Sequence, residues 1–307
     1  MSQLRDHLFD YLRIRRSLGY KLERAEKLLL QFLVYLEERG TEIVTVADTV
    51  AWARLPAGSP DWWAFRLSAV RGFASYLHAL DSAHEVPAAD LLPRRPPRAI
   101  PYLYTEAEIA ALMAATGGLR GRLRQSTYRT LLGLLSVTGM RAGEAIRLDR
   151  HDLDLAHDVV TVRDSKFGKS RLLPLHRTTV TALRRYLRLR ESHQRATVSD
   201  ALFISPAGTR LLYCNLHATF RQLRRDARLD AGSGRCRPRI HDLRHSFAVR
   251  TLLDWYRAGD DVQARLPLLS TYLGHAHPKD TYWYLSAAPE LLTIAGQRLE
   301  RSLGGRP

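Results

Sequence analysis

Apolar residues at helical spacing dominate the first hundred residues. Between residues 4 and 39, leucines and one phenylalanine recur three or four positions apart, and the run is broken at Gly19. This pattern predicts two helices. Capping patterns at Thr45 and Ser59 predict the starts of a third and a fourth. We therefore expect an all-helical domain over residues 1–92, with its tryptophans in the core.

A stretch rich in proline and arginine follows this domain. Residues 93–101, PRRPPRAIP, contain four prolines and three arginines. Proline cannot continue a helix, so the stretch is predicted to be an extended, basic linker. Two interpretations of its arginines remain open: they are solvated, or they touch phosphates while two domains close around a duplex.

The second domain, residues 102–307, mixes two periodicities. Helical patterns follow a capping box at Thr105 and recur over residues 127–137. Between residues 152 and 175, the short runs LDL, VVTV and RLLPL predict a small antiparallel sheet. Basic helices around a short strand, ALFI at 201–204, come next. Their arginines, Arg224 among them, are expected to form solvated or phosphate-facing stripes. The predicted fold class is mainly α, with a small antiparallel β-sheet in the second domain.

The charge of the chain points to a polyanionic partner. Lys and Arg number 47 against 31 Asp and Glu, which gives a formal net charge of +16. Residues 1–100 hold 14 basic and 12 acidic residues, and the other 33 basic and 19 acidic residues lie in residues 101–307. This excess favours nucleic acid as the partner and places the main phosphate contacts in the second half.

The cysteines and the hydropathy of the chain indicate where in the cell the protein is expected. Cys214 and Cys236 are isolated and lack a CxxC spacing, so they predict neither a disulfide nor a zinc site. The chain starts with the charged segment MSQLRDHLFD, and no apolar run reaches membrane-spanning length. We expect a soluble, cytoplasmic protein.

Four segments of the second domain carry groups suited to a phosphate. They are TGMRAGE with Arg141, DSKFGKSR with Lys166, HDLRH with His241 and Arg244, and LGHAHPKDTYWY with His275 and Tyr284. A tyrosine hydroxyl titrates near pH ~10, so a tyrosine nucleophile needs neighbours that stabilise charge on the reacting centre. Together these groups predict a phosphate site that uses no metal and no cofactor.

In this order across residues 138–284, the four motifs resemble the tyrosine recombinases, the phage-integrase family of site-specific recombinases. The resemblance implies a helical, SAM-like core-binding domain that grips DNA opposite a catalytic domain. It also implies four protomers on two paired sites of double-stranded DNA. The expected activity is cleavage and rejoining of strands, without ATP, through a covalent 3′-phosphotyrosine.

The resemblance also implies a role for each residue. Tyr284 would be the nucleophile, and Arg141 and Arg244 would stabilise the phosphate oxygens. Lys166, which lies five residues before Arg171 as the family pattern requires, would be the general acid in preference to Lys169. The same resemblance makes His241 the acceptor of the tyrosine proton and His275 a hydrogen-bond donor to the phosphate.

Two other tyrosines compete for the nucleophile's place. Tyr272 and Tyr282 lie in the same segment as Tyr284. On a helix, Tyr282 and Tyr284 project about 200° apart, so only one of them can face the arginines. The nine-residue step from His275 matches the family motif at Tyr284.

Other interpretations remain to be weighed. His241 and His245, with His275 or His277, have a spacing that zinc could use, although no HExxH motif or nearby carboxylate supports it. Rival functions are a type IB topoisomerase, a non-catalytic DNA-binding regulator and a metal nuclease. The apolar stripe Leu291, Leu292, Ile294 and Leu299 could pack on its own core or dock on a neighbouring protomer.

Overall fold

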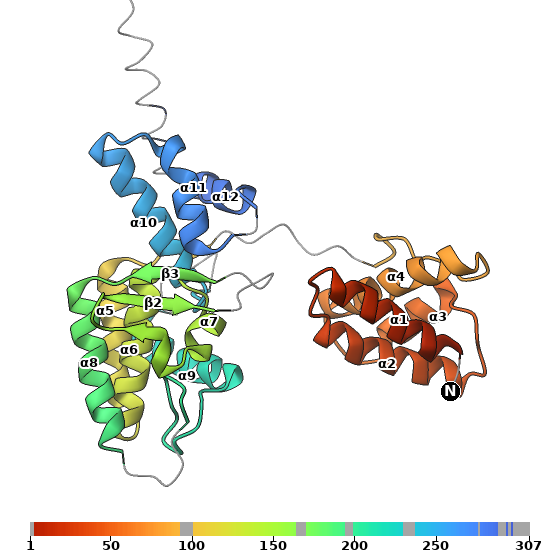
Figure 1. Ribbon diagram of the computed structural model, residues 1–307, viewed down its shortest axis with the longest axis horizontal. Helices are drawn as coiled ribbons and strands as arrows, with labels where there is room; N and C mark the ends of the chain where they lie inside the picture. Colours follow the sequence, from red (N-terminus) through yellow and green to blue (C-terminus); the bar gives the residue numbers. More distant parts are fainter. Residues whose placement is uncertain are drawn as a thin grey trace, which may run out of the picture. The chain divides into compact units, whose positions relative to one another are not determined.

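The chain divides into two compact units, residues 1–99 and 100–307 (Figure 1). The computed structural model describes residues 3–92, 101–163, 170–193, 199–229, 237–275 and 277–287, together with positions 293 and 296. The unit boundary falls within the proline-rich stretch 93–101, and all of that stretch except Pro101 lies outside the described residues. Each unit has its own apolar core.

The first unit is helical, as predicted. Its helices are α1 (Gln3–Ser17), α2 (Glu23–Glu38), α3 (Val46–Arg54) and α4 (Pro60–Leu80). The hydroxyls of Thr45 and Ser59 cap α3 and α4 by accepting backbone N–H groups. Phe32, Phe73 and Trp52 are buried in the core, so the expected packing of that tryptophan is confirmed.

The second unit holds eight α-helices within its described residues. They are α5 (Glu106–Ala115), α6 (Arg122–Thr138), α7 (Ala142–Arg147), α8 (Arg177–Glu191), α9 (Tyr213–Asp226), α10 (Asp242–Ala258), α11 (Val262–Leu273) and α12 (Lys279–Ala287). Leu131, Tyr186 and Phe203 are buried in its main core. A smaller apolar cluster joins α10, α11 and α12 and includes Tyr284. These three helices lie together at the blue end of the unit (Figure 1).

A three-stranded antiparallel sheet has the predicted order. Its strands are β1 (Leu153–Asp154), β2 (Val159–Val162) and β3 (Arg171–Pro174). Val160 of β2 lies opposite Leu173 of β3, and both are buried. The expected strand at 201–204 was wrong, because Ala201 and Ile204 make only isolated bridges, to Asp149 and Arg210.

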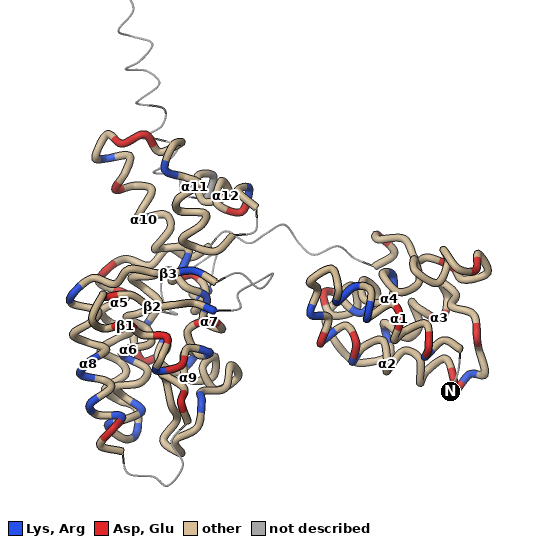
Figure 2. Tube along the Cα trace, in the orientation of Figure 1, with Lys and Arg blue, Asp and Glu red and all other residues tan. Residues whose placement is uncertain are grey.

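Basic residues are spread along α8 and α9 of the second unit (Figure 2). One expectation about them was wrong: Arg224 of α9 does not lie on a solvated stripe. It is buried and donates a hydrogen bond to the carbonyl of Pro238 at 3.0 Å. Within the described residues, no helix combines the length and apolarity needed to cross a bilayer.

Candidate active site

Arg141 is positioned by the sharp turn that ends α6. Gly139 has a left-handed backbone, with φ at 60°, and a Cβ at this position would lie 2.4 Å from Cδ1 of Phe247. The close approach to α10 therefore requires glycine. Two residues later Arg141 is the N-cap of α7, and its side chain is partly exposed. The turn thus presents a guanidinium at the start of a helix.

Glu144 is a buried carboxylate held between two arginines. It accepts hydrogen bonds from Nη1 of Arg141 at 2.8 Å and from Nη2 of Arg171, in β3, at 2.7 Å. Burial alone would raise the pKa of this carboxyl. The hydrogen bonds and charges of Arg171 and Arg141 outweigh burial, so the pKa of Glu144 falls to about 2. Glu144 is therefore an anion that orients both guanidinium groups.

Arg244 lies deeper than Arg141, in the first turn of α10, and only 2% of it is exposed. Its Nη1 donates to the carbonyl of Gly139 at 2.9 Å, and its Nη2 donates to that of Leu273 at 2.8 Å. Burial lowers the pKa of Arg244 to about 10, although the nearby Tyr284 side chain opposes that shift. Arg244 therefore remains a cation at neutral pH.

Three arginines bind the carbonyl groups at the C-terminal end of α11. Besides the bond from Arg244 to Leu273, Arg171 donates to the carbonyl of Tyr272 at 2.8 Å, and Arg141 donates to that of Gly274 at 3.1 Å. The C-terminal end of a helix carries partial negative charge, so cations are stabilised there. The end of α11 thus collects the cationic groups of the site in one place.

His275 follows this helix end directly and faces Tyr284. The two rings are stacked, with centroids 5.9 Å apart and planes inclined by 24°. One ring nitrogen, Nδ1 of His275, lies 2.6 Å from Oγ1 of Thr281, a buried residue of α12. His275 is therefore fixed between α11 and the helix that carries the tyrosine.

His241 stands at the edge of this group. It is the exposed N-cap of α10, and its ring meets that of the buried His245 edge-on, with centroids 4.8 Å apart. His245 in turn packs against Trp283 and Tyr284, at 5.2 and 5.5 Å. His245 thus connects His241 to the tyrosine.

A metal cluster of the histidines finds no support in the described part of the chain. The group of three potential ligands found there is Asp149, His151 and Asp152, which lies elsewhere in the fold. Both of its carboxylates are already paired, Asp149 with Arg210 and Asp152 with Arg163.

The three tyrosines differ in their surroundings. Tyr284 is 1% exposed and contacts Arg244 and His275, whereas Tyr282 is 53% exposed. Tyr272 lies in α11, where it is half-buried and stacked on Phe247 at 5.7 Å. Of the three, Tyr284 is thus the one that lies buried beside Arg244 and His275. Lys166, the predicted general acid, lies outside the described residues.

Comparison with known proteins identifies the family of the chain. The family model of the phage integrase family matches residues 103–290. The chain belongs to this family of tyrosine recombinases. The protein y4rB of Sinorhizobium fredii, which bears the name integrase/recombinase, is 44% identical over 308 residues, or 98% of both chains. The tyrosine recombinase XerD of Mycobacterium tuberculosis is 32% identical over 301 residues, or 92% of each chain.

Solved structures of tyrosine recombinases share the two-domain fold. The Tn1549 transposon integrase in complex with transposon right end DNA aligns with a TM-score of 0.64 at 18% identity, over 98% of this chain and 99% of that one. XerA recombinase aligns with a TM-score of 0.52 at 24% identity, over 99% of this chain and 100% of that one. At this level of identity the likeness concerns the fold. The fold class predicted from sequence is confirmed.

Two residues of this recombinase site were missed by sequence reasoning. Glu144 carried a usable signal, because it lies three residues after the N-cap Arg141, where a carboxylate can accept the N-cap backbone N–H; it does so at 2.9 Å. Arg171 carried no such signal. Its partners Glu144 and Tyr272 lie 27 and 101 residues away in the chain.

Proposed function

We propose that this tyrosine recombinase is a site-specific DNA recombinase that cleaves and rejoins DNA strands without ATP or metal. The oxygen of Tyr284 attacks a DNA phosphorus, which forms a 3′-phosphotyrosine bond and breaks the bond to the 5′-oxygen. His241 accepts the tyrosine proton, and Lys166 protonates the leaving 5′-oxygen. Because the phosphoester is conserved, a 5′-hydroxyl of another strand can reverse the reaction and complete the exchange.

The arginines and His275 have the task of stabilising charge in this reaction. The non-bridging phosphate oxygens gain negative charge in the transition state. Arg141 and Arg244 each present a planar guanidinium that donates two N–H groups to such oxygens. His275 adds a further donor from the end of α11. Glu144 keeps Arg141 in place without entering the reaction.

The observation that carries this proposal is the burial of Tyr284 beside Arg244 and His275. It places the most buried cation of the site next to the one tyrosine, of the three in this segment, that is almost fully buried. A tyrosine that serves only as core packing needs no charged neighbour, and burying a charge costs free energy. The pairing suits a nucleophile that must stand beside the phosphate it attacks.

A suicide-substrate trap tests the proposal. The full chain is incubated in EDTA with nicked duplex from its own genomic flanks, so that the released strand diffuses away and the covalent adduct accumulates. We expect an adduct with the wild-type chain and none with Tyr284→Phe. Tyr282→Phe is the matched control, since it removes an exposed hydroxyl two residues away, and it should form the adduct normally.

Loss of the adduct in Tyr282→Phe would overturn the assignment of the nucleophile. No adduct with any variant, on DNA that the wild-type chain binds specifically, would favour a non-catalytic regulator on the same fold.

We further propose that four protomers act on two paired duplex sites in the cytoplasm, with the helical unit over residues 1–92 gripping the duplex opposite the catalytic unit. A lambda integrase tetramer bound to a Holliday junction is among the solved structures of similar fold, with a TM-score of 0.59 at 18% identity. Light scattering with and without the duplex tests the assembly. A tetramer on DNA is expected, and a 1:1 complex at saturation would contradict it.

A further inference from the structure

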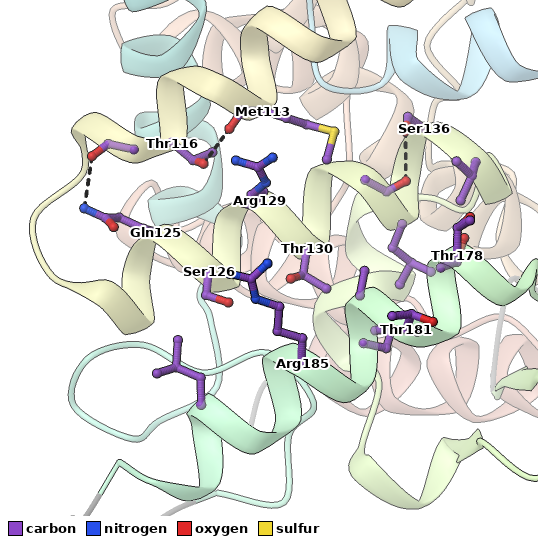
Figure 3. A pocket seen from close by; sticks show the side chains of 18 of the residues that line it. Met113, Thr116, Gln125, Ser126, Arg129, Thr130, Ser136, Thr178, Thr181 and Arg185 are labelled. Carbon is purple, nitrogen blue, oxygen red and sulfur yellow. Dashed lines mark hydrogen bonds between the residues drawn. The ribbon is translucent and has the colours of Figure 1, made fainter.

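A groove between α6 and α8 lies apart from the residues proposed for catalysis. It has a volume of about 980 Å³. The two helices run in opposite directions along it, so that the first turn of α6 lies near the end of α8, while Val137 and Thr178 line the other end. None of the six proposed catalytic residues lines this groove. Figure 3 shows it from close by.

Small and apolar groups form the floor of the groove. Ser126, Thr130 and Gly133 share one face of α6, because they lie at positions i, i+4 and i+7. Thr178, Ala182 and Arg185 repeat that spacing on α8. Apolar atoms come from Met113, Leu134, Val137, Leu183 and Leu189. Short side chains on both helices leave room for the backbone of a third segment.

Unpaired cations surround this floor. Arg122 and Arg129 of α6 and Arg185 of α8 line the groove. Figure 3 labels Arg129 and Arg185. None of the residues that line it in the described part of the chain is acidic. Within the same described residues these three arginines form no hydrogen bond and no ion pair, whereas the neighbouring Arg184 donates to the carbonyl of Leu155. The groove thus offers three free guanidinium groups beside an apolar surface.

We propose that the α6–α8 groove binds an acidic amphipathic helix of a partner protein. From residue 122 to residue 137 the groove follows α6 for about 22 Å, or about four helical turns. A helix of this length would place its apolar face on the floor and its carboxylates against the arginines, as in helix-in-groove recognition. A DNA duplex offers the charge but no apolar face for the floor.

The chain's own tail does not fit this site by charge. Residues 288–307 contain three arginines and two glutamates, so the tail would bring more positive charge to the groove. An acidic partner satisfies both the charge and the apolar floor. This inference does not depend on the proposed strand cleavage.

Binding of a designed peptide tests the proposal. The probe is a fluorescein-labelled helical peptide with leucines on one face and glutamates on the other, and its glutamate-to-lysine counterpart is the control. Fluorescence anisotropy with the full chain should show binding of the acidic peptide only. The double variant Arg129→Glu with Arg185→Glu should weaken that binding by about tenfold or more.

Two further variants separate the groove from general electrostatics. Arg177→Glu with Arg188→Glu makes the same charge change on exposed arginines of α8 that do not line the groove, and it should alter affinity less than about twofold. Thr130→Trp fills the floor without changing charge and should weaken binding as strongly as the groove double variant. All these variants should still form the Tyr284 adduct at the wild-type rate.

Several results would overturn the proposal. They are failure of the acidic peptide to bind, equal weakening by both double variants, and unchanged binding in Thr130→Trp. A fourth result would identify the groove as a DNA-binding surface: the wild-type chain does not bind the peptide, and the groove double variant binds random duplex DNA about tenfold more weakly than wild type.

Discussion

At the scale of single residues, Arg171 is the side chain that connects the small sheet to the candidate active site. It joins three parts of the chain: β3, the Glu144 carboxylate in α7 and the carbonyl of Tyr272 at the end of α11. Arg171 is therefore a positioning residue, which acts through Glu144 on Arg141 and through α11 on His275. It has no direct role in the proposed chemistry.

Replacing Arg171 by methionine should impair both stability and cleavage. Breaking a buried ion pair by removing one partner costs about 3 kcal/mol or more, because the remaining charge stays buried. We expect Arg171→Lys to restore part of the stability but less of the activity, since an ammonium cannot reproduce the planar fork. The rate of adduct formation at saturating DNA separates the two effects. Equal activity of wild type and Arg171→Met would contradict this positioning role.

Glu144 predicts acid sensitivity in a defined range. Its folded pKa of about 2 lies below the value of 4.5 for an unperturbed glutamate. A lowered folded pKa contributes stability above the unfolded pKa, and this contribution is lost as pH falls towards the folded pKa. At pH 6, the free energy of unfolding of the wild-type chain should therefore exceed that of Glu144→Gln. This difference should shrink as the pH falls from about 4.5 to about 2. Denaturant titrations at each pH measure it, and a constant difference would refute the mechanism.

At the scale of elements, the ends of helices and strands were the most predictable features, since their signals are local. Thr105 and Glu108 form the predicted capping box of α5, and Gly139 ends α6 where expected. The failures have a common cause in tertiary contacts. The segment at 201–204 has the pattern of a strand, but among the described residues it makes only isolated bridges. Arg224 lies in a basic stretch that predicts exposure, but it is buried.

In the candidate site, too, local motifs were predictable and tertiary contacts were not. Motif spacing placed Arg141, Arg244, His275 and Tyr284 in one group, and the fold brings them together. Local sequence could not show that Arg171 bridges two of its parts, because that contact depends on how the sheet packs against α11. Nor could it show that His241 lies at the edge of the group while His245 touches the tyrosine.

The turn after α11 makes a testable contrast between two glycines. Gly274 and Gly259 both end helices with a left-handed backbone. A Cβ at Gly274 would lie 2.7 Å from Nη1 of Arg171, whereas a Cβ at Gly259 meets nothing within 4 Å. Gly259→Ala should therefore cost only the backbone strain, about 1 kcal/mol. Gly274→Ala should cost more and also slow adduct formation, and equal behaviour of the two variants would contradict the role of this turn.

The burial of Tyr284 predicts a movement of α12. A side chain that is 1% exposed cannot reach a phosphate without displacement of the helix that carries it. We expect hydrogen exchange of the backbone amides in residues 279–287 to increase when the cognate duplex binds. Exchange that is unchanged or slower in an active complex would show that DNA reaches Tyr284 by another route.

At the scale of the whole molecule, charge is unequally divided between the two units. Their boundary at residues 99 and 100 leaves nearly all of the +16 net charge in the second unit. Expressed separately, the second unit should bind duplex DNA with the steeper dependence on salt, because each phosphate contact releases counterions. Filter binding between 50 and about 200 mM salt measures both slopes. A steeper slope for the first unit would contradict this division.

The central claim, that Tyr284 becomes bonded to DNA, is tested most directly by identifying the modified residue. The adduct trapped on nicked duplex is digested with nuclease and protease, and the peptides are sequenced by mass spectrometry. We predict a nucleotide-bearing phosphotyrosine at Tyr284 in the peptide that also contains Tyr282. A modification at Tyr282 or Tyr272, or an adduct through any other residue, would contradict the account.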